Sequence, residues 1–536
     1  MAKNNFLKGA AILGLAGIIV KILGAFYRIP LSNMIGPEGM GYYQTAYPLY
    51  VLLVAISTSG FPTAIAKIVS EKRALQDYKG AHRVFRISFM GFLAAGIITS
   101  LFVYFTAGFI VKAVGNSKAY YSLIAMTPAL FFVPIMSAFR GYFQGRQTMT
   151  PTAISQFIEQ LFRVAIGLFL AYQLVGLGLP QAAGGASFGA SAGAIAGTIV
   201  IVIIYLKEKG KITDEIKNSI ASEPESISKI VKDILVIAIP ITIGASILPI
   251  INTIDTFLIM RRLQEIGFNE KEATALYGQL TGNAQTLVNL PQVLSMAISV
   301  SLVPAISGAF ARKDFAEVKN TTKSGIRVTL LIGLPSAMGL FILATPIIDL
   351  LYYNYDMATK VSTGAILQIL SIGLIFLTLV QSFTAILQGV GKPMIPVKNL
   401  AIGAVVKAVF TYVLTGIPSI NVKGAAISTG IAYLVAAVLN FIEVKKYTKV
   451  QFKFLDIALK PIISTLIMTF VAWASYKYTS PLLGSKISTV FSIGTGGISY
   501  IIALFLSGAI TSEDFELLPS GDKLARKLKS KGILKS

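Results

Sequence analysis

The sequence predicts an all-α polytopic membrane protein of about fourteen transmembrane helices, with two pseudo-symmetric six-helix lobes followed by two C-terminal helices. Of its 536 residues, 13% are charged and 54% are hydrophobic, and the mean hydropathy is +0.72. A soluble domain carries roughly 25% charged residues, so most of this chain does not face water. Apolar runs of about 20 residues, long enough to cross a bilayer, recur from end to end. In addition, the first half of the sequence resembles the second.

The apolar runs place the helices in order, and the Gly and Pro residues inside several of them are tolerated in membranes as kinks. The approximate spans are 9–30, 42–66, 87–111, 121–139, 151–175, 183–206, 233–260, 273–306, 328–348, 361–389, 397–416, 424–444, 461–476 and 487–509.

Basic residues orient these spans. With the N-terminus in the cytoplasm, 34 of the 47 Lys and Arg residues fall in cytoplasmic segments and 9 in outer loops. The positive-inside rule therefore predicts that both termini are cytoplasmic. The net charge of +23 then favours contact with anionic lipids, and no nucleic acid is expected as a partner.

Composition and motifs exclude several chemistries. The chain has no Cys, which rules out disulfides and thiolate metal sites. The only His, His82, is expected to be solvated in a basic loop, which makes zinc sites and His-based catalysis improbable. Neither a D-x-D motif nor a G-x-x-x-x-G-K-[ST] motif occurs. We therefore expect no enzyme activity, no bound metal and no cofactor.

An internal repeat relates residues 138–163 to residues 382–407. Each segment has a Gln-Gly pair near the cytoplasmic end of one predicted helix and a Pro that opens the next. Arg163 and Lys407 each lie 19 residues after the Gln of that pair. A basic residue is thus expected at the same depth of the membrane in each half.

The repeat also predicts the domain organisation. Small-residue helix faces at 189–199 and 424–434 correspond to each other and are suited to close packing. Because each half has an even number of spans, both halves enter the membrane in the same orientation, which is typical of transporters with a substrate site between the halves. The expected parts are an N-lobe over 1–206, a cytoplasmic linker over 207–232, a C-lobe over 233–445, two further helices within 446–509 and a basic cytoplasmic tail over 510–536.

Charged residues within the predicted spans mark a candidate substrate site, because a charge at mid-membrane costs at least ~2.5 kcal/mol and usually faces a cavity. Lys21 and Arg28 lie two turns apart on one face of the first helix. Glu159 and Arg163 are four residues apart and can pair, and Lys407 is the counterpart of Arg163. This mainly basic set favours an anion such as a phosphate or pyrophosphate. Two structural alternatives stay open: Arg28 snorkels to the interface, and Glu159–Arg163 is a structural ion pair.

Two further polar residues within the predicted spans form a candidate ion site. Asp255, in the seventh predicted span, is suited to bind a cation or a proton or to cap a local polar network, and Asn399 at the start of the eleventh span is placed to join it. Coupling to Na⁺ or H⁺, or to the membrane potential alone, stays open.

Three stretches resemble the MOP flippase superfamily, namely residues 21–44, 139–164 and 287–307. Within it, the chain looks most like the polysaccharide-transporter branch that contains the Gram-positive lipid II flippase MurJ and the stage V sporulation protein B (SpoVB). The run FQGRQ…PTAISQ…EQ…R between 143 and 163 is fairly specific to this branch. The resemblance covers nearly the whole chain.

The resemblance implies fourteen helices in two lobes, in a monomer of the bacterial plasma membrane. It implies export of a polyprenyl-linked glycan, a cell-wall precursor, from the inner to the outer leaflet. Basic residues on the first helix of such flippases engage the pyrophosphate, and Lys21 and Arg28 match those positions. The last two helices are expected to form a groove for the polyprenyl tail.

The chain departs from the Gram-negative pattern of this superfamily at three places. A basic residue is missing from 48–62, Thr286 stands where another is expected, and Gly403 replaces a carboxylate four residues after Asn399. We hypothesise that Arg163 and Lys407 compensate for the missing basic residues. The sequence does not indicate whether the glycan belongs to vegetative peptidoglycan, spore cortex, teichoic acid or capsule.

Two other function classes compete with a flippase. A cation-coupled multidrug exporter of the same superfamily is disfavoured by the basic cavity and by the fourteen helices, since such exporters typically have twelve. A membrane glycosyltransferase is disfavoured by the missing motifs and by the short outer loops.

Overall fold

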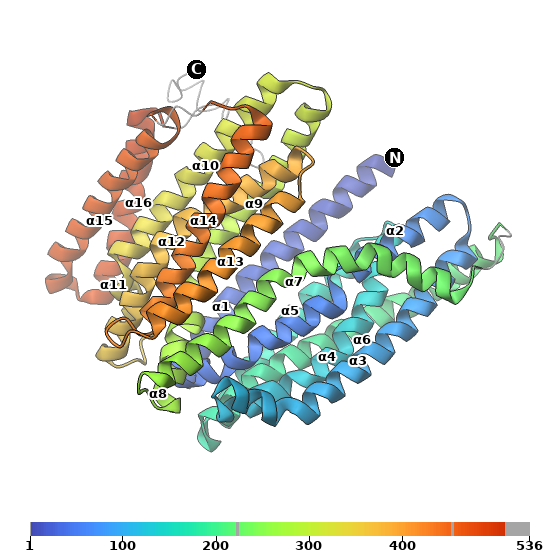
Figure 1. Cartoon of the computed structure of the whole chain (residues 1–536), viewed down its shortest axis with the longest axis horizontal. Coiled ribbons are helices and arrows are strands. Elements are labelled where there is room, and N and C mark those ends of the chain that lie inside the picture. The colour runs from blue at the N-terminus through green and yellow to red at the C-terminus, as the bar shows by residue number, and fades with distance from the viewer. Residues whose placement is uncertain (1, 221–224, 452–454, 510–536) are drawn as a thin grey trace. The chain divides into compact units, whose positions relative to one another are not determined.

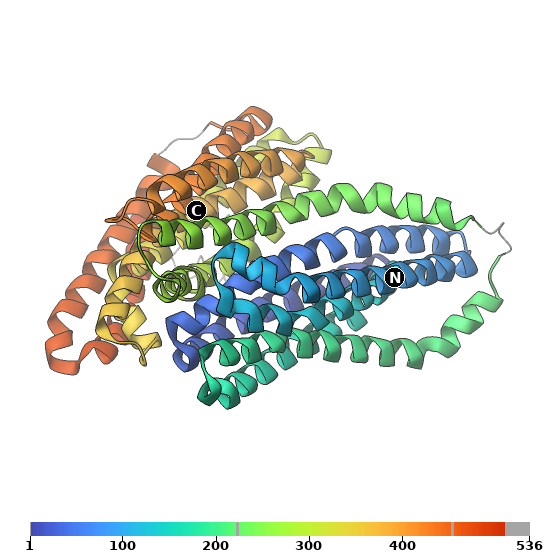
Figure 2. The ribbon, with the colours of Figure 1, turned by 60° about the horizontal axis from the view of Figure 1, so that its bottom comes forward.

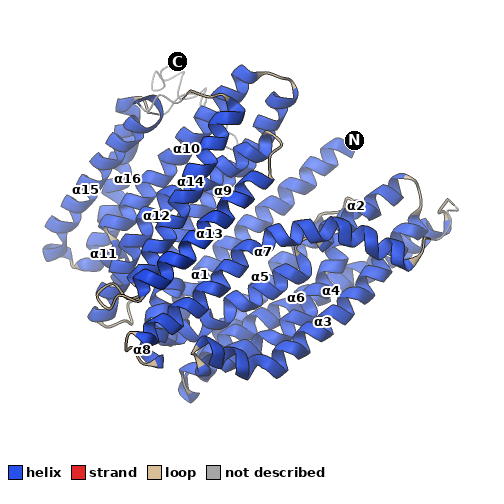
Figure 3. Ribbon diagram, viewed as in Figure 1, coloured by secondary structure: helices blue, strands red, loops and turns tan. Residues whose placement is uncertain are grey.

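The computed structural model describes residues 2–220, 225–451 and 455–509, with the side chains of residues 2–16, 18, 21, 455 and 456 left out. The helices labelled in Figure 1 are α1 (Ala2–Thr58), α2 (Phe61–Ala74), α3 (Tyr78–Val114), α4 (Tyr120–Gly145), α5 (Thr150–Leu174), α6 (Leu179–Lys217), α7 (Ile227–Glu265), α8 (Glu270–Tyr277), α9 (Gln285–Ala311), α10 (Phe315–Ile342), α11 (Ala344–Leu351), α12 (Met357–Gly389), α13 (Met394–Thr415), α14 (Lys423–Thr448), α15 (Lys460–Leu483) and α16 (Ser485–Ser507). Figure 3 shows only helices and connecting loops over these ranges.

Thirteen helices of the described part are long and apolar enough to cross a membrane, which confirms the prediction of an all-α polytopic protein. The first of them, counted over residues 22–74, covers the end of the first predicted span and all of the second. They are separate segments, because α1 is interrupted at Gly36, where φ is 67°. Glycine adopts this conformation readily, and the following Pro37 disfavours helix at the residue before it.

By their contacts, the described residues form two units. Unit 1 contains residues 1–264 and 268–278, and unit 2 contains residues 265–267 and 279–536. α7 thus lies in unit 1, whereas the sequence prediction assigned residues 233–445 to the second lobe. The two lobes that the internal repeat predicts therefore stay a prediction.

Polar contacts near its middle and at its C-terminal end attach α7 to the rest of unit 1, along which it runs in Figure 2. The amide of Gly60 donates to Thr242 Oγ1 at 3.2 Å. A Cβ atom at Gly60 would overlap the carbonyl oxygen of Ala238, so only glycine permits this approach. At the C-terminal end of α7, Arg261 Nε donates to the carbonyl of Ala113 at 2.9 Å. The hydropathy of α7 does not encode these hydrogen bonds, which is why the sequence did not predict the helices that α7 contacts.

The predicted linker over 207–232 is largely helical. α6 continues to Lys217 and α7 begins at Ile227, so the connection between them is short. Alternating Lys and Glu residues after Leu206 support a solvated extension of α6, because opposite charges three or four residues apart attract. The predicted basic tail over 510–536 lies outside the described residues.

Each unit has its own hydrophobic core. In unit 1 the core lies among α1, α3, α4 and α6. In unit 2 one core lies among α9, α10, α12 and α14. α15 and α16 add a smaller cluster against α10, where the hydroxyl of Tyr500 donates to the carbonyl of Leu331 at 2.7 Å. The last two helices therefore pack as part of unit 2.

Candidate functional site

The break at Gly36 folds α1 back on itself and assembles the first part of the site. In a continuous helix, Arg28 and Tyr47 would lie about 28 Å apart. Instead, the guanidinium of Arg28 lies 5.4 Å from the ring centroid of Tyr47. A cation over an aromatic face is attracted by the ring quadrupole. This contact gives Arg28 a partner inside unit 1.

Tyr47 belongs to a row of four tyrosines on α1, and the other three are buried. The rings of Tyr43 and Tyr47 stack with centroids 5.6 Å apart, and Tyr27 meets Tyr43 edge-on at 6.4 Å. Tyr50 continues the row, 6.1 Å from Tyr47. The hydroxyl of Tyr27 donates to the carbonyl of Ala186 on α6 at 3.1 Å, which anchors the row to the bundle.

Glu159 of α5 is shared between two arginines. Its Oε1 lies 3.0 Å from Arg163 Nη2, and its Oε2 lies 3.0 Å from Arg140 Nη2 on α4. The exposed fractions of the three side chains are 16%, 17% and 13%, so water screens the charges only weakly. Arg140 Nε also donates to Ser155 Oγ at 2.9 Å. The predicted pairing of Glu159 with Arg163 is therefore present, as part of a larger network.

Arg163 joins this network to the tyrosines. Its guanidinium interacts with the hydroxyl of Tyr50, and both Arg163 and Arg28 act electrostatically on Tyr27 and Tyr43. Arg163 Nε is buried and makes no hydrogen bond with any part of the chain that the structure describes. A donor thus stays available beside the row of tyrosines.

Glycines on α6 permit the close approach that holds α5 in place. A Cβ atom at Gly193 would overlap the carbonyl oxygen of Glu159, and one at Gly189 would overlap that of Arg163. The small-residue face predicted at 189–199 therefore does contact its neighbour closely. This contact sets the position of the two charged residues of α5.

The described part of the site has an excess of positive charge. Arg28, Arg140 and Arg163 contribute three guanidinium groups, and Glu159 contributes one carboxylate. Guanidinium groups bind the oxygens of phosphates in planar, two-point fashion, so the arrangement suits an anion. The backbone of Lys21 lies in α1, but its side chain is outside the described residues.

The sequence missed Arg140, because it was counted with the cytoplasmic loop after the fourth span. The structure continues α4 to Gly145, so Arg140 lies on the helix and reaches Glu159. The apolar residues Tyr142 and Phe143, both buried, were the signal that the helix continues.

The remaining predicted residues are distributed over the two units. Lys407 is partly buried on α13 of unit 2. Asn399, also on α13, donates from Nδ2 to Asn440 Oδ1 at 2.8 Å. Asp255 is buried on α7 of unit 1, where the neighbouring Thr256 lies 2.8 Å from the hydroxyl of Tyr277. The two residues of the predicted ion site thus belong to different units.

Comparison with known proteins agrees with this architecture. Residues 6–310 match the family described as "Polysaccharide biosynthesis protein", and residues 281–413 match the MatE family. The uncharacterized membrane protein YabM of Bacillus subtilis is 30% identical over 97% of this chain and 96% of its own length. The lipid II flippase MurJ of the same organism is 28% identical over 95% of this chain and 94% of its own length.

A solved structure of lipid II flippase MurJ, in an inward closed conformation, has the same fold. It aligns with a TM-score of 0.68 at 19% identity, covering 92% of this chain and 98% of that one. The chain therefore belongs to the polysaccharide biosynthesis protein family of the MOP flippase superfamily.

Proposed function

We propose that this protein is a flippase, which moves lipid II or a related polyprenyl-pyrophosphate oligosaccharide from the inner to the outer leaflet by alternating access. The observation that supports this proposal most directly is the partly buried, net-positive cluster of Arg28, Arg140, Arg163 and Glu159, which suits a pyrophosphate. The relative named as a lipid II flippase, similar over nearly its whole length, supports this cargo.

In this proposal, Arg28 and Arg163 contact the pyrophosphate, aided by Lys21. Glu159 holds Arg163 in place. No covalent chemistry is involved. The protein works as a monomer in the bacterial plasma membrane, with both termini in the cytoplasm.

A second candidate is a cation-coupled multidrug exporter, which the match of residues 281–413 to the MatE family favours. An exporter of cations is expected to favour carboxylates in its cavity. The described cluster has three guanidinium groups and one carboxylate, which is the opposite balance.

The test is flipping in cells. The protein is depleted in a host without another lipid II flippase, and the lipid II that a membrane-impermeant external probe reaches is measured. We expect wild type to restore outer-leaflet lipid II and the double variant Lys21→Ala/Arg28→Ala to fail.

Lys67→Ala/Lys217→Ala is the matched control, because it removes two exposed cations outside the cluster. It is expected to act as wild type. If depletion leaves the exposure of lipid II unchanged, lipid II is the wrong cargo, and other polyprenyl-linked glycans are tested in the same assay.

A further inference from the structure

A cavity of about 570 Å³ lies in unit 1, away from the cluster of α1, α4 and α5. Its walls are the first turns of α3, the extension of α6 and the first residue of α7. Its charged lining residues are Lys79, Arg83 and Arg86 from α3 and Lys209 from α6, and no carboxylate of the described chain lines it. We call it the basic cavity. Its volume is within the usual range of small-molecule sites.

The cations of α3 share one face of the helix. Lys79, Arg83 and Arg86 are spaced by four and three residues, which places their side chains above one another. Lys209 approaches from α6. Like charges at this spacing repel, so their gathering does not stabilise the empty protein. A bound anion relieves this repulsion.

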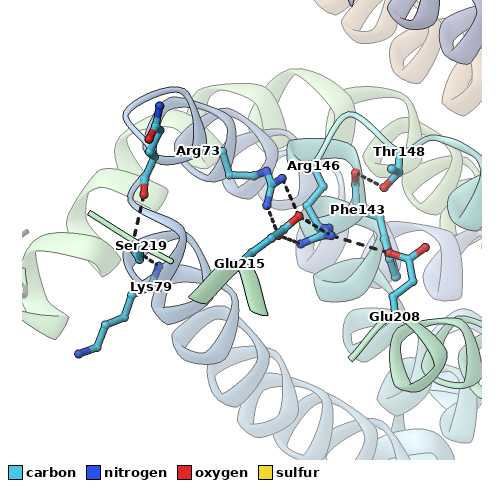
Figure 4. A network of polar contacts seen from close by, with 9 residues as sticks. Arg73, Lys79, Phe143, Arg146, Thr148, Glu208, Glu215 and Ser219 are labelled. Atoms are coloured by element: carbon cyan, nitrogen blue, oxygen red, sulfur yellow. Dashed lines mark hydrogen bonds and ion pairs between the residues drawn. The ribbon is translucent and has the colours of Figure 1, made fainter. Parts of the chain in front are cut away.

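The nearby carboxylates are bound to other cations. Glu215 lies 2.7 Å from both Arg73 and Arg146, and Figure 4 shows the side chain of Lys79 pointing away from it. Glu225 lies 2.7 Å from Lys72. These contacts link α2, α4 and α6.

Glu225 lies outside the membrane-spanning helices, and it too is paired with nearby lysines. Hydrogen bonds from Lys72 and Lys229 hold the pKa of the Glu225 carboxyl below its usual range, so it stays ionised on its own partners. Within the described ranges, none of the four cations of the basic cavity forms an ion pair.

His82 adds an independent observation. The sequence placed it in a solvated loop, but it lies on α3, partly buried between the rings of Phe85 and Tyr142, because the helix begins four residues earlier. It lines the basic cavity, and its Nδ1 is buried without a hydrogen-bond partner among the described residues. A buried polar atom without a partner costs free energy.

We propose that the basic cavity binds a phosphate group: that of an anionic phospholipid headgroup or of a free phosphate compound. The guanidinium groups of Arg83 and Arg86 bind the oxygens, and Lys79 and Lys209 complete the positive wall. Isoleucines of all three helices and Tyr205 form the apolar part of the lining, which fits the glycerol and first acyl carbons of a lipid. The site is independent of the proposed flippase function, because it shares no residue with the cluster around Glu159.

The test uses the absence of cysteine from the chain. Thr213 lines the basic cavity and is exposed, so Thr213→Cys provides a single reactive thiol there. The full-length protein is placed in phosphatidylcholine nanodiscs with or without phosphatidylglycerol, and its alkylation by uncharged N-ethylmaleimide is timed. Inorganic phosphate added to pure phosphatidylcholine discs tests the free compound. At a ligand concentration ten times Kd, we expect alkylation to slow by about tenfold.

Matched controls separate this site from general surface charge. Arg83→Gln/Arg86→Gln is expected to abolish the protection, and Lys67→Gln/Lys217→Gln, with the same loss of charge, is expected to keep it. If the arginine variant does not fold, Lys79→Gln/Lys209→Gln replaces it. Leu75→Cys, exposed outside the cavity, reports non-specific effects.

Each outcome bears on the proposal. Protection by phosphatidylglycerol supports a lipid headgroup, and protection by inorganic phosphate alone supports a free compound. The proposal is overturned if neither protects, if the thiol at 75 is protected equally, or if both double variants lose protection equally.

Discussion

Among single residues, Glu159 has the most constrained electrostatic environment in the candidate site. Its two carboxylate oxygens each pair with a different guanidinium, from Arg140 and Arg163, at 3.0 Å. Breaking a buried ion pair from one side is costly, because the partner charge stays buried without compensation. Removing the charge of Glu159 leaves two guanidinium groups, those of Arg140 and Arg163, without a compensating carboxylate.

We therefore predict that Glu159→Gln lowers the free energy of unfolding by about 3–5 kcal/mol. The amide keeps the shape of the side chain but removes the charge that balances Arg140 and Arg163. Thermal and denaturant unfolding of the purified protein in detergent measure the change.

Glu71→Gln is the control for this prediction. Its carboxylate is 61% exposed and pairs with Lys67 on the surface of α2 at 3.7 Å. Exposed pairs contribute roughly 0–1 kcal/mol, so a small change is expected. Equal losses in the two variants would show that burial of the Glu159 network does not matter.

Among the helices, the contact of α5 with α6 positions the site. Gly189 and Gly193 lie against the backbone of Arg163 and Glu159, so the two helices approach without intervening side chains. This backbone contact positions the charged residues of α5.

We predict that Gly193→Ala destabilises the protein by about 1–3 kcal/mol, because the added methyl group forces the two helix backbones apart. Since Glu159 moves with α5, the same variant is expected to reduce flipping. Unfolding in detergent and the external-probe assay measure the two effects.

Gly91→Ala on α3 is the matched control, because a Cβ atom there meets nothing within 4 Å. Alanine is the better helix former by about 1 kcal/mol, so this variant is expected to be as stable as wild type or more so. A Gly193→Ala protein with the same stability as Gly91→Ala contradicts the proposed close contact.

For the whole molecule, the charge of the proposed cargo determines how the membrane potential drives transport. In the proposed cycle, a negative pyrophosphate moves outward and the empty, positive cavity resets inward. Because the charges of the cavity return to their starting position over a full cycle, only the exported negative charge counts, and an inside-negative potential favours its outward movement by about 2.3 kcal/mol per charge and 100 mV.

We predict that valinomycin with external K⁺, which collapses the membrane potential, stops the appearance of lipid II outside. Nigericin, which removes the pH gradient but keeps the potential, is expected to have little effect. The external-probe assay in cells that depend on this protein measures both. Inhibition by nigericin alone would instead indicate proton coupling, for which Asp255 is the first residue to test.

The sequence alone determined the all-α polytopic class, the approximate helix positions and the charged residues within them. Hydropathy and charge are local properties, and a bilayer acts on each segment in turn, so a window of about 20 residues predicts a span. Glu159 and Arg163 were paired correctly for the same reason, since one helix turn brings residues four apart together.

Only the tertiary structure decided which distant residues meet. Arg140 reaches Glu159, Arg28 meets Tyr47 across the break at Gly36, and α7 packs within unit 1. The basic cavity likewise depends on which carboxylates are already bound to Arg73, Arg146 and Lys72. These contacts depend on the packing of whole helices, which no local pattern of hydropathy or charge encodes.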